Sequence, residues 1–301
     1  MFKGGNFILN KENSSKIILH AVEATEPLWR NFGEEWDNID QVFLSRAYEQ
    51  QGFYLHRFVI LLEKYQIYSI DSIGTILDSY HGERKYRRDF AGLIESPFYK
   101  TLKAGKYGSE GERFYRCAKE FKGNFGAGYW RNLWWMLICC HDLKMKYKSS
   151  FSFYLKSKYG KFKGLKQITD SDFKNMSIKD WEGFLKTHPW DELYGVGENV
   201  FHYIMRDIKE LEFVKDSEKL DSANIHFLKV TGIMKEDEIN RENMEKLLLS
   251  LNLPYNISEV NKGLYSYCAE TAADSYGFCR SHKKCSGCKV NKICDGPKNL
   301  N

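Results

Sequence analysis

Four cysteines crowd into the C-terminal stretch GFCRSHKKCSGCKVNKICDG, residues 277–296, and constrain the fold more than any other feature. Their spacing is Cys-x5-Cys-x2-Cys-x5-Cys, at Cys279, Cys285, Cys288 and Cys294. A loop this tight can gather four thiolates around one centre, and a cytoplasmic chain would not normally keep them as disulfides. Zinc and an iron–sulfur cluster both accept four thiolates. The spacing therefore predicts a metal centre and leaves its metal open.

The other four cysteines lie in apolar or mixed helical surroundings. There a buried and inert thiol is the usual explanation, because free cysteine packs like a small apolar residue. We interpret them as structural thiols: Cys117, Cys139, Cys140 and Cys268.

The composition indicates a globular protein. About 15% of the 301 residues are aromatic and the charges are mixed, which does not suit disorder. The longest apolar run, LWWMLICC, is too short to cross a bilayer, and the first residues lack the apolar core of a signal peptide. The formal net charge of +5 only mildly favours polyanionic partners. We therefore expect a cytoplasmic protein with no membrane association.

The pattern of apolar residues predicts a mainly α-helical fold. Prolines are few, and apolar residues recur at spacings of three and four over 41–65. Residues 133–145 are apolar nearly all round, which is typical of a central buried helix. No run alternates well enough to predict a strand. Helix-capping pairs and loops complete the pattern: Ser177 with Asp180, Asn256 with Glu259, and loops at 104–111 and 157–166.

A lysine-rich segment lies between Asp142 and Asp170. Eight lysines are interleaved there with aromatic residues, and no acidic residue intervenes. Lysines among aromatics suit a surface that neutralises phosphates and stacks on bases. A solvated lysine-rich connector explains the segment equally well.

The stretch DELYGVGENVFHYIMRDI, residues 191–208, is typical of two helices joined by a tight turn. A first helix is expected to end near Leu193, and Gly195 and Gly197 permit the turn. The apolar residues between Val200 and Ile208 then form one face of a second helix. Backbone amides at such a helix start suit a nucleic-acid phosphate. An ordinary helix corner also contains glycines, so both interpretations stay open.

In their order along the chain, these features resemble the helix-hairpin-helix DNA glycosylases of the endonuclease III and mismatch adenine glycosylase type. LYGVG is similar to the family's Leu-Pro-Gly-Val-Gly, with Tyr194 in place of the proline. LDSANIHFLKVTGI aligns with the segment that carries the family's catalytic aspartate, which places Asp221 on that aspartate and Gly232 on a family glycine. The cysteine loop is one residue shorter than the family's Cys-x6-Cys-x2-Cys-x5-Cys. VFLSRAYEQQGF, residues 42–53, resembles the adenine glycosylases' Trp-Leu-Ser-Glu-Val-Met-Leu-Gln-Gln-Thr.

The resemblance covers roughly 40–65 and 175–296, and it implies a two-lobed helical glycosylase fold with a helix-hairpin-helix and a C-terminal cluster loop. The implied cofactor is a [4Fe–4S] cluster on the four loop cysteines, with zinc as the alternative. The implied division is an N-terminal segment 1–35, a glycosylase-like domain 36–276 with insertions at about 66–123 and 144–174, and the cluster loop 277–296. Gly195, Val196 and Gly197 are then expected to contact DNA.

Cleavage of an N-glycosidic bond builds positive charge on the sugar, so a nearby carboxylate must stabilise that charge or orient water. Asp221 is the candidate for this role, although the same residue is also a good helix N-cap. Members that cut the backbone use a lysine two positions after the last hairpin glycine. Asn199 stands at that site, and because an amide cannot form a Schiff base, we expect no lysine-based lyase.

Three residues of the 42–53 match have implied roles near the base. Gln50 and Gln51 fall on glutamines that in the family sit beside the opened base stack, where they could fill the gap left by a flipped base. Arg46 replaces the glutamate that protonates the leaving base in adenine-cleaving members, and arginine cannot act as a general acid. Arg46 could contact a base or a phosphate, and a surface helix arginine is the plain alternative.

The leading hypothesis is a monofunctional DNA glycosylase that removes a damaged or modified base from duplex DNA, acting as a monomer. A non-catalytic nucleic-acid-binding protein of the same fold is the first alternative, favoured by the changes at Tyr194, Asn199 and Arg46. An N-glycosidase acting on RNA or a modified nucleotide is the second.

Overall fold

The computed structural model of the protein describes residues 9–30, 35–48, 62–77, 112–113, 116–117, 120, 127–215, 220–269, 277, 279–280 and 282–299. All elements in these ranges are helical, which confirms the mainly α-helical class. Across the same ranges, no helix is long and apolar enough to cross a membrane. The chain divides into two compact units: unit 1 joins residues 1–33 to 211–301, and unit 2 is residues 34–210.

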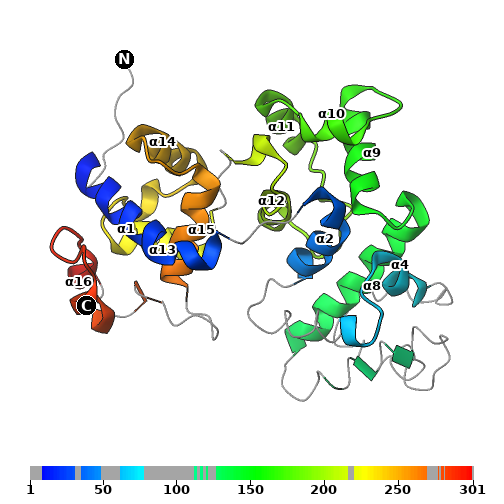
Figure 1. The fold of residues 1–301 in the computed structure, drawn as a ribbon, viewed down its shortest axis with the longest axis horizontal. Helices are drawn as coiled ribbons and strands as arrows, with labels where there is room; N and C mark the ends of the chain where they lie inside the picture. Colours follow the sequence, from blue (N-terminus) through cyan, green and yellow to red (C-terminus); the bar gives the residue numbers. More distant parts are fainter. Residues whose placement is uncertain are drawn as a thin grey trace. The chain divides into compact units, whose positions relative to one another are not determined.

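Unit 1 packs helix α1 with helices from the C-terminal third of the chain around one apolar core (Figure 1). Helix α15 packs against α1, α13 and α14. The elements are α1 (Lys11–Trp29), η4 (Glu212–Val214), α13 (Ser222–Val230), η5 (Glu236–Glu238), α14 (Arg241–Leu251), α15 (Ile257–Cys268), η6 (His282–Gly287) and α16 (Gly296–Asn299).

The contact between α1 and α15 depends on a glycine. A Cβ at Gly263 of α15 would lie 2.8 Å from the Cα of Val22 in α1. The hydroxyl of Thr25 in α1 also donates to the carbonyl of Gly263, at 3.1 Å. The missing side chain therefore allows the two backbones to approach closely.

Unit 2 is a second helical body, in which α8 contacts α4, α2 and α9. Its core is aromatic: the rings of Phe43 and Phe151 stack at 4.4 Å, and those of Trp181 and Phe201 stack at 6.2 Å. The elements are η1 (Trp36–Asn38), α2 (Ile39–Tyr48), α4 (Ile70–Thr75), α8 (Ala127–Tyr147), α9 (Phe151–Lys163), α10 (Asp170–Lys174), α11 (Ile178–Leu185) and α12 (Glu198–Arg206).

Several local predictions are confirmed. The central helix expected at 133–145 is α8, and the side chains from Met136 to Cys140 are buried. The Ser177 hydroxyl accepts from the amide of Asp180 at 3.1 Å, and Asn256 with Glu259 forms a reciprocal capping box. The helix expected over 41–65 is present to Tyr48; residues 49–61 and the loop expected at 104–111 lie outside the described residues.

The loop expected at 157–166 is wrong over most of its length, because α9 continues to Lys163. Ser150 caps the helix by accepting from the Phe153 amide at 3.2 Å. Gly164, with a left-handed φ of 67°, ends it. The aromatic residues between the lysines supply a buried face, so helical packing outweighs the basic composition.

The first helix of the expected hairpin also ends earlier than predicted, at Leu185 rather than near Leu193. Residues 186–197 form turns. His188 takes a left-handed φ of 50° directly before Pro189, and neither residue can continue the helix there.

We predict that Gly263→Ala lowers the free energy of unfolding by about 1–3 kcal/mol, because the new methyl group meets the backbone of α1. Alanine in place of a helical glycine ordinarily stabilises by about 1 kcal/mol, so the sign is diagnostic. Urea denaturation followed by circular dichroism measures the change. The control is Gly183→Ala in α11, whose methyl group meets only the ring tip of Phe162 and should cost little. An equal effect from both variants would contradict the prediction.

Candidate functional site

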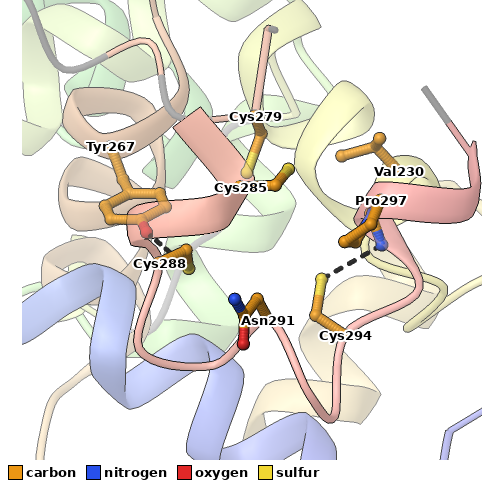
Figure 2. Close-up of a pocket in the computed structure, with 9 residues that line it drawn as sticks. Val230, Tyr267, Cys279, Cys285, Cys288, Asn291, Cys294 and Pro297 are labelled. Carbon is orange, nitrogen blue, oxygen red and sulfur yellow. Dashed lines mark hydrogen bonds between the residues drawn. The ribbon is translucent and has the colours of Figure 1, made fainter. Parts of the chain in front are cut away.

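The four loop cysteines surround one pocket in unit 1 (Figure 2). The cysteines lie in different local structures: Cys285 is in η6, and turns separate it from Cys294. The remaining wall comes from α13, α15 and α16. The residues lining the pocket are Val230, Tyr267, Cys279, Cys285, Cys288, Asn291, Cys294, Gly296 and Pro297.

Polar groups make hydrogen bonds to two of the four sulfurs. The Tyr267 hydroxyl lies 3.2 Å from Cys288 Sγ, and the amide of Gly296 donates to Cys294 Sγ at 3.2 Å (Figure 2). Burial raises the pKa of Cys294 to about 11, and the Gly296 amide opposes that shift. An amide donor of this kind favours the thiolate form of Cys294.

A fifth cysteine touches the set. The thiol of Cys268, the last residue of α15, hydrogen-bonds that of Cys279, and this contact together with burial raises the pKa of Cys279. Sequence reasoning treated Cys268 as an inert core thiol and did not notice Tyr267. Both residues continue the buried face of α15 after Leu264, and only that periodicity could have indicated where they point.

No group of three or more His, Cys, Asp or Glu side chains in the described ranges is gathered to hold a metal ion. Four sulfurs around zinc, at Zn–S bonds of about 2.3 Å, must stand within about 4 Å of each other. The four loop cysteines line a common space, and both zinc and an iron–sulfur cluster accept four thiolates. A group with several metal atoms separates its ligands further than a single ion does.

The cysteine loop is fastened to α13. Nε2 of His226, within α13, lies 2.6 Å from the Cys279 carbonyl oxygen. The amide of Asp295 donates to the carbonyl of Thr231, which caps the C-terminal end of the helix, at 3.2 Å. Gly232 follows with a φ of 76°, and a Cβ there would lie 2.7 Å from Oδ2 of Asp295. Glycine is therefore required at position 232 for two reasons: the backbone is left-handed there, and a side chain would collide with Asp295 of the loop.

Asp221 stands at the other end of α13, as its N-cap. Its Oδ1 accepts from the amides of Ala223 and Asn224, each at 2.9 Å. The described residues offer Oδ2 no hydrogen bond, and the side chain is half-buried. The positive end of the helix favours a negative charge there. One oxygen is thus held while the other is available for chemistry.

The LYGVG segment of unit 2 forms the predicted tight turn. Gly195 has a left-handed φ of 78°, and a Cβ there would lie 2.6 Å from the ring of Trp135. Val196 is buried, whereas Gly197 is exposed as the N-cap of α12, with no atom near its missing Cβ. Asn199, in the first turn of α12, is exposed. The amides at the start of α12 therefore border open space, as an anion contact requires.

Arg46 of α2 is held within unit 2. Its Nε donates to Oδ2 of Asp207 at 2.5 Å, and its guanidinium lies 5.6 Å from the ring centre of Tyr203. The Arg46 side chain is 16% exposed and that of Asp207 is 2% exposed, so the pair is largely removed from water. This differs from a solvated surface arginine. Gln50 and Gln51, the other candidates of that segment, lie outside the described residues.

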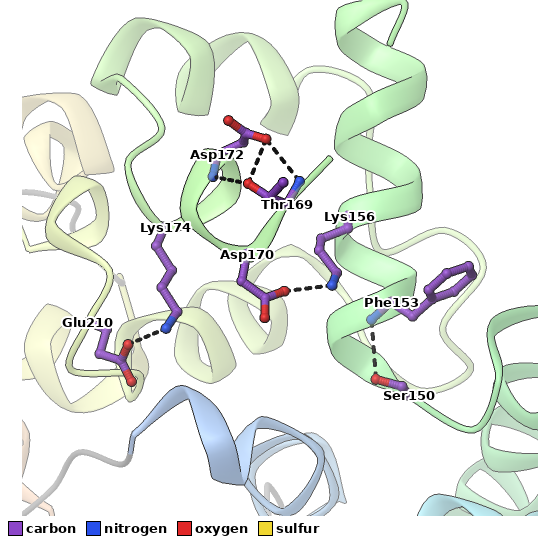
Figure 3. Close-up of polar contacts among 8 residues, drawn as sticks. All are labelled: Ser150, Phe153, Lys156, Thr169, Asp170, Asp172, Lys174 and Glu210. Atoms are coloured by element: carbon purple, nitrogen blue, oxygen red, sulfur yellow. Dashed lines mark hydrogen bonds and ion pairs between the residues drawn. The ribbon is translucent and has the colours of Figure 1, made fainter. Parts of the chain in front are cut away.

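The lysines of α9 are largely neutralised by nearby carboxylates (Figure 3). Lys156 donates to Asp170 at 2.6 Å and Lys163 to Asp180 at 2.9 Å, and Lys158 pairs with Glu192. These carboxylates lie at or after Asp170 in the sequence, so the lysine-rich segment taken by itself looks purely basic. Such pairs reduce the charge available to a phosphate, which favours a role for these lysines within unit 2.

Comparison with family models, with curated proteins and with solved structures finds no match to this chain. The site must therefore be interpreted from its own geometry.

We predict that Asp207→Asn destabilises the protein by about 2–4 kcal/mol, because it removes the negative charge to which the largely buried Arg46 guanidinium donates. Thermal unfolding measured by circular dichroism gives the change. Glu112→Gln is the matched control: it removes the carboxylate of the exposed Arg116–Glu112 pair and should cost less than about 0.5 kcal/mol. Equal stability of the two variants would show that the Arg46 pair contributes nothing.

Proposed function

We propose that the protein is a monofunctional DNA N-glycosylase that removes a damaged or modified base, with Asp221 as the catalytic carboxylate. One observation carries this proposal: a single nine-residue helix, α13, has the carboxylate at its N-cap and the four-cysteine pocket at its C-terminal end. At a rise of about 1.5 Å per residue, the two features stand only about 13 Å apart along the helix. In this proposal, the cysteine loop holds in place the helix that carries Asp221.

The chemistry requires a negative group beside a sugar that becomes cationic as the base departs. Two backbone amides orient Asp221 through Oδ1, which leaves Oδ2 to face the sugar or to bind the attacking water. A carboxylate fixed in this way loses little side-chain entropy in the transition state. The exposed turn at Gly195 and Gly197 supplies amides suited to a DNA phosphate.

The pocket suits a [4Fe–4S] cluster, with zinc as the alternative. Its donor set is four thiols, which both metal centres accept, and polar groups contact two of them. A bound cluster would cross-link the loop and so hold the end of α13 in place. The four cysteines are the residues that would hold it.

Two residues differ from those of the resembled family, and each difference limits the proposed reaction. Asn199 offers no amine for attack on the opened sugar, so the product is an abasic site rather than a cut strand. Arg46, paired with Asp207, supplies no proton to a leaving adenine. The expected substrates are bases other than the mismatched adenine of the adenine glycosylases.

We predict that Asp221→Asn lowers single-turnover base release by about 10²–10⁴-fold while leaving stability nearly unchanged, because asparagine caps a helix as well as aspartate does. The assay is release of free base from duplexes carrying alkylated, oxidised, deaminated or hypermodified bases, with mononucleotides and RNA tested beside them. Asn240→Ala is the control. It removes the N-cap of α14 in the same unit, costs about 1 kcal/mol, and should keep activity.

The outcomes separate the alternatives. DNA binding without base release by the native protein would support a binding protein that keeps Asp221 only as a cap. Release from RNA or nucleotides alone would move the proposal to another N-glycosidase. Equal activity of Asp221→Asn and the native protein would remove the catalytic assignment.

Anaerobically purified protein is predicted to contain about four irons per chain and a broad visible absorbance, both lost in Cys294→Ser. Serine has no thiolate to offer a cluster iron. Cys140→Ala, which changes a buried thiol in α8, should retain the iron. One zinc and no iron, measured by metal and sulfide analysis, would contradict the cluster assignment.

A further inference from the structure

The hydroxyl of Tyr267 approaches a loop cysteine from a separate helix. Tyr267 belongs to α15, and its hydroxyl oxygen lies 3.2 Å from Sγ of Cys288, which is 21 residues further along the chain (Figure 2). The ring is only 2% exposed and lines the cysteine pocket. A buried hydroxyl needs a hydrogen-bond partner, and this one is directed at sulfur.

The position of the ring is fixed by its neighbours. It meets the rings of His20 and Phe227 edge to face, with centroids 5.7 Å and 6.3 Å away. These contacts come from α1 and α13, so three helices of unit 1 hold the tyrosine in place. A hydroxyl held this way needs little rearrangement when a metal binds.

We propose that Tyr267 is a positioning residue for the metal centre, whose hydroxyl donates to the Cys288 sulfur and holds it as a metal-bound thiolate. The inference rests on the metal centre proposed above and specifies which side chain retains it. Only a thiolate binds a metal, and a hydrogen bond from a rigidly held hydroxyl fixes the position of its sulfur. Partners in this second layer typically change metal affinity by about 10–100-fold.

The alternative is a tyrosine that only fills the core. In that case the ring would matter and the hydroxyl would not. Tyr267→Phe separates the two roles, because it keeps the ring and both edge-to-face contacts while removing one oxygen. Tyr265→Phe is the matched control: it makes the same change two residues away in α15, on a side chain that is 42% exposed.

The experiment measures metal release from the full chain. Protein loaded with its metal is mixed with excess chelator, and the loss of visible absorbance is followed for iron or the gain of a chelator dye signal for zinc. The expected result is release about tenfold faster for Tyr267→Phe and unchanged for Tyr265→Phe, with both variants folded by circular dichroism. If iron is present, the cluster's reduction potential should also fall in Tyr267→Phe, because a donor to sulfur stabilises the more negative reduced form.

Equal release rates for Tyr267→Phe and the native protein would overturn the proposal. A native chain that binds neither iron nor zinc would overturn both it and the metal centre. A glycosylase assay that fails for every variant while the release rates still differ would remove the proposed activity and leave the role of Tyr267 standing.

Discussion

The attachment of the C-terminal loop to α13 is the interaction on which the proposed site depends. His226 meets the Cys279 carbonyl, and the Asp295 amide meets the Thr231 carbonyl, so the loop is tied to the middle and the end of one helix. Gly232 makes this possible, since any side chain there would strike Asp295. These contacts add to the packing of α13 against α15 in orienting the helix that carries Asp221, because helix propensity is weak in so short an element.

Basic side chains of unit 2 form ion pairs with carboxylates of the same unit. The basic residues of α9 meet carboxylates from the segment that follows, and Lys174 pairs with Glu210 (Figure 3). Exposed pairs of this kind contribute little individually. The Arg46–Asp207 pair is different, because little water reaches it and each charge compensates the other. Much of the basic charge of α9 is therefore balanced within unit 2.

Local signals in the sequence predicted local structure well. The apolar run of α8, the caps at Ser177 and Asn256 and the turn at Gly195 all depend on residues a few positions apart. The loop expected at 157–166 failed because lysines hid an aromatic helical face. Contacts between residues far apart in the sequence could not be predicted. Tyr267 lies against Cys288, and Arg46 pairs with a residue 161 positions away. The four cysteines that line the pocket stand out in the sequence, but the groups that contact them do not.

Unit 1 combines residues 1–33 with residues 211–301, so its core cannot form until late in synthesis. Helix α1 emerges first from the ribosome, yet Gly263, which its backbone must approach, is made more than 230 residues later. At about 5–20 residues per second, the apolar face of α1 waits for roughly 10–50 seconds without its partner. Residues 34–210 can become compact meanwhile, as an insertion within an unfinished unit. The core of unit 1 can therefore close only late in synthesis, after α15 has been made.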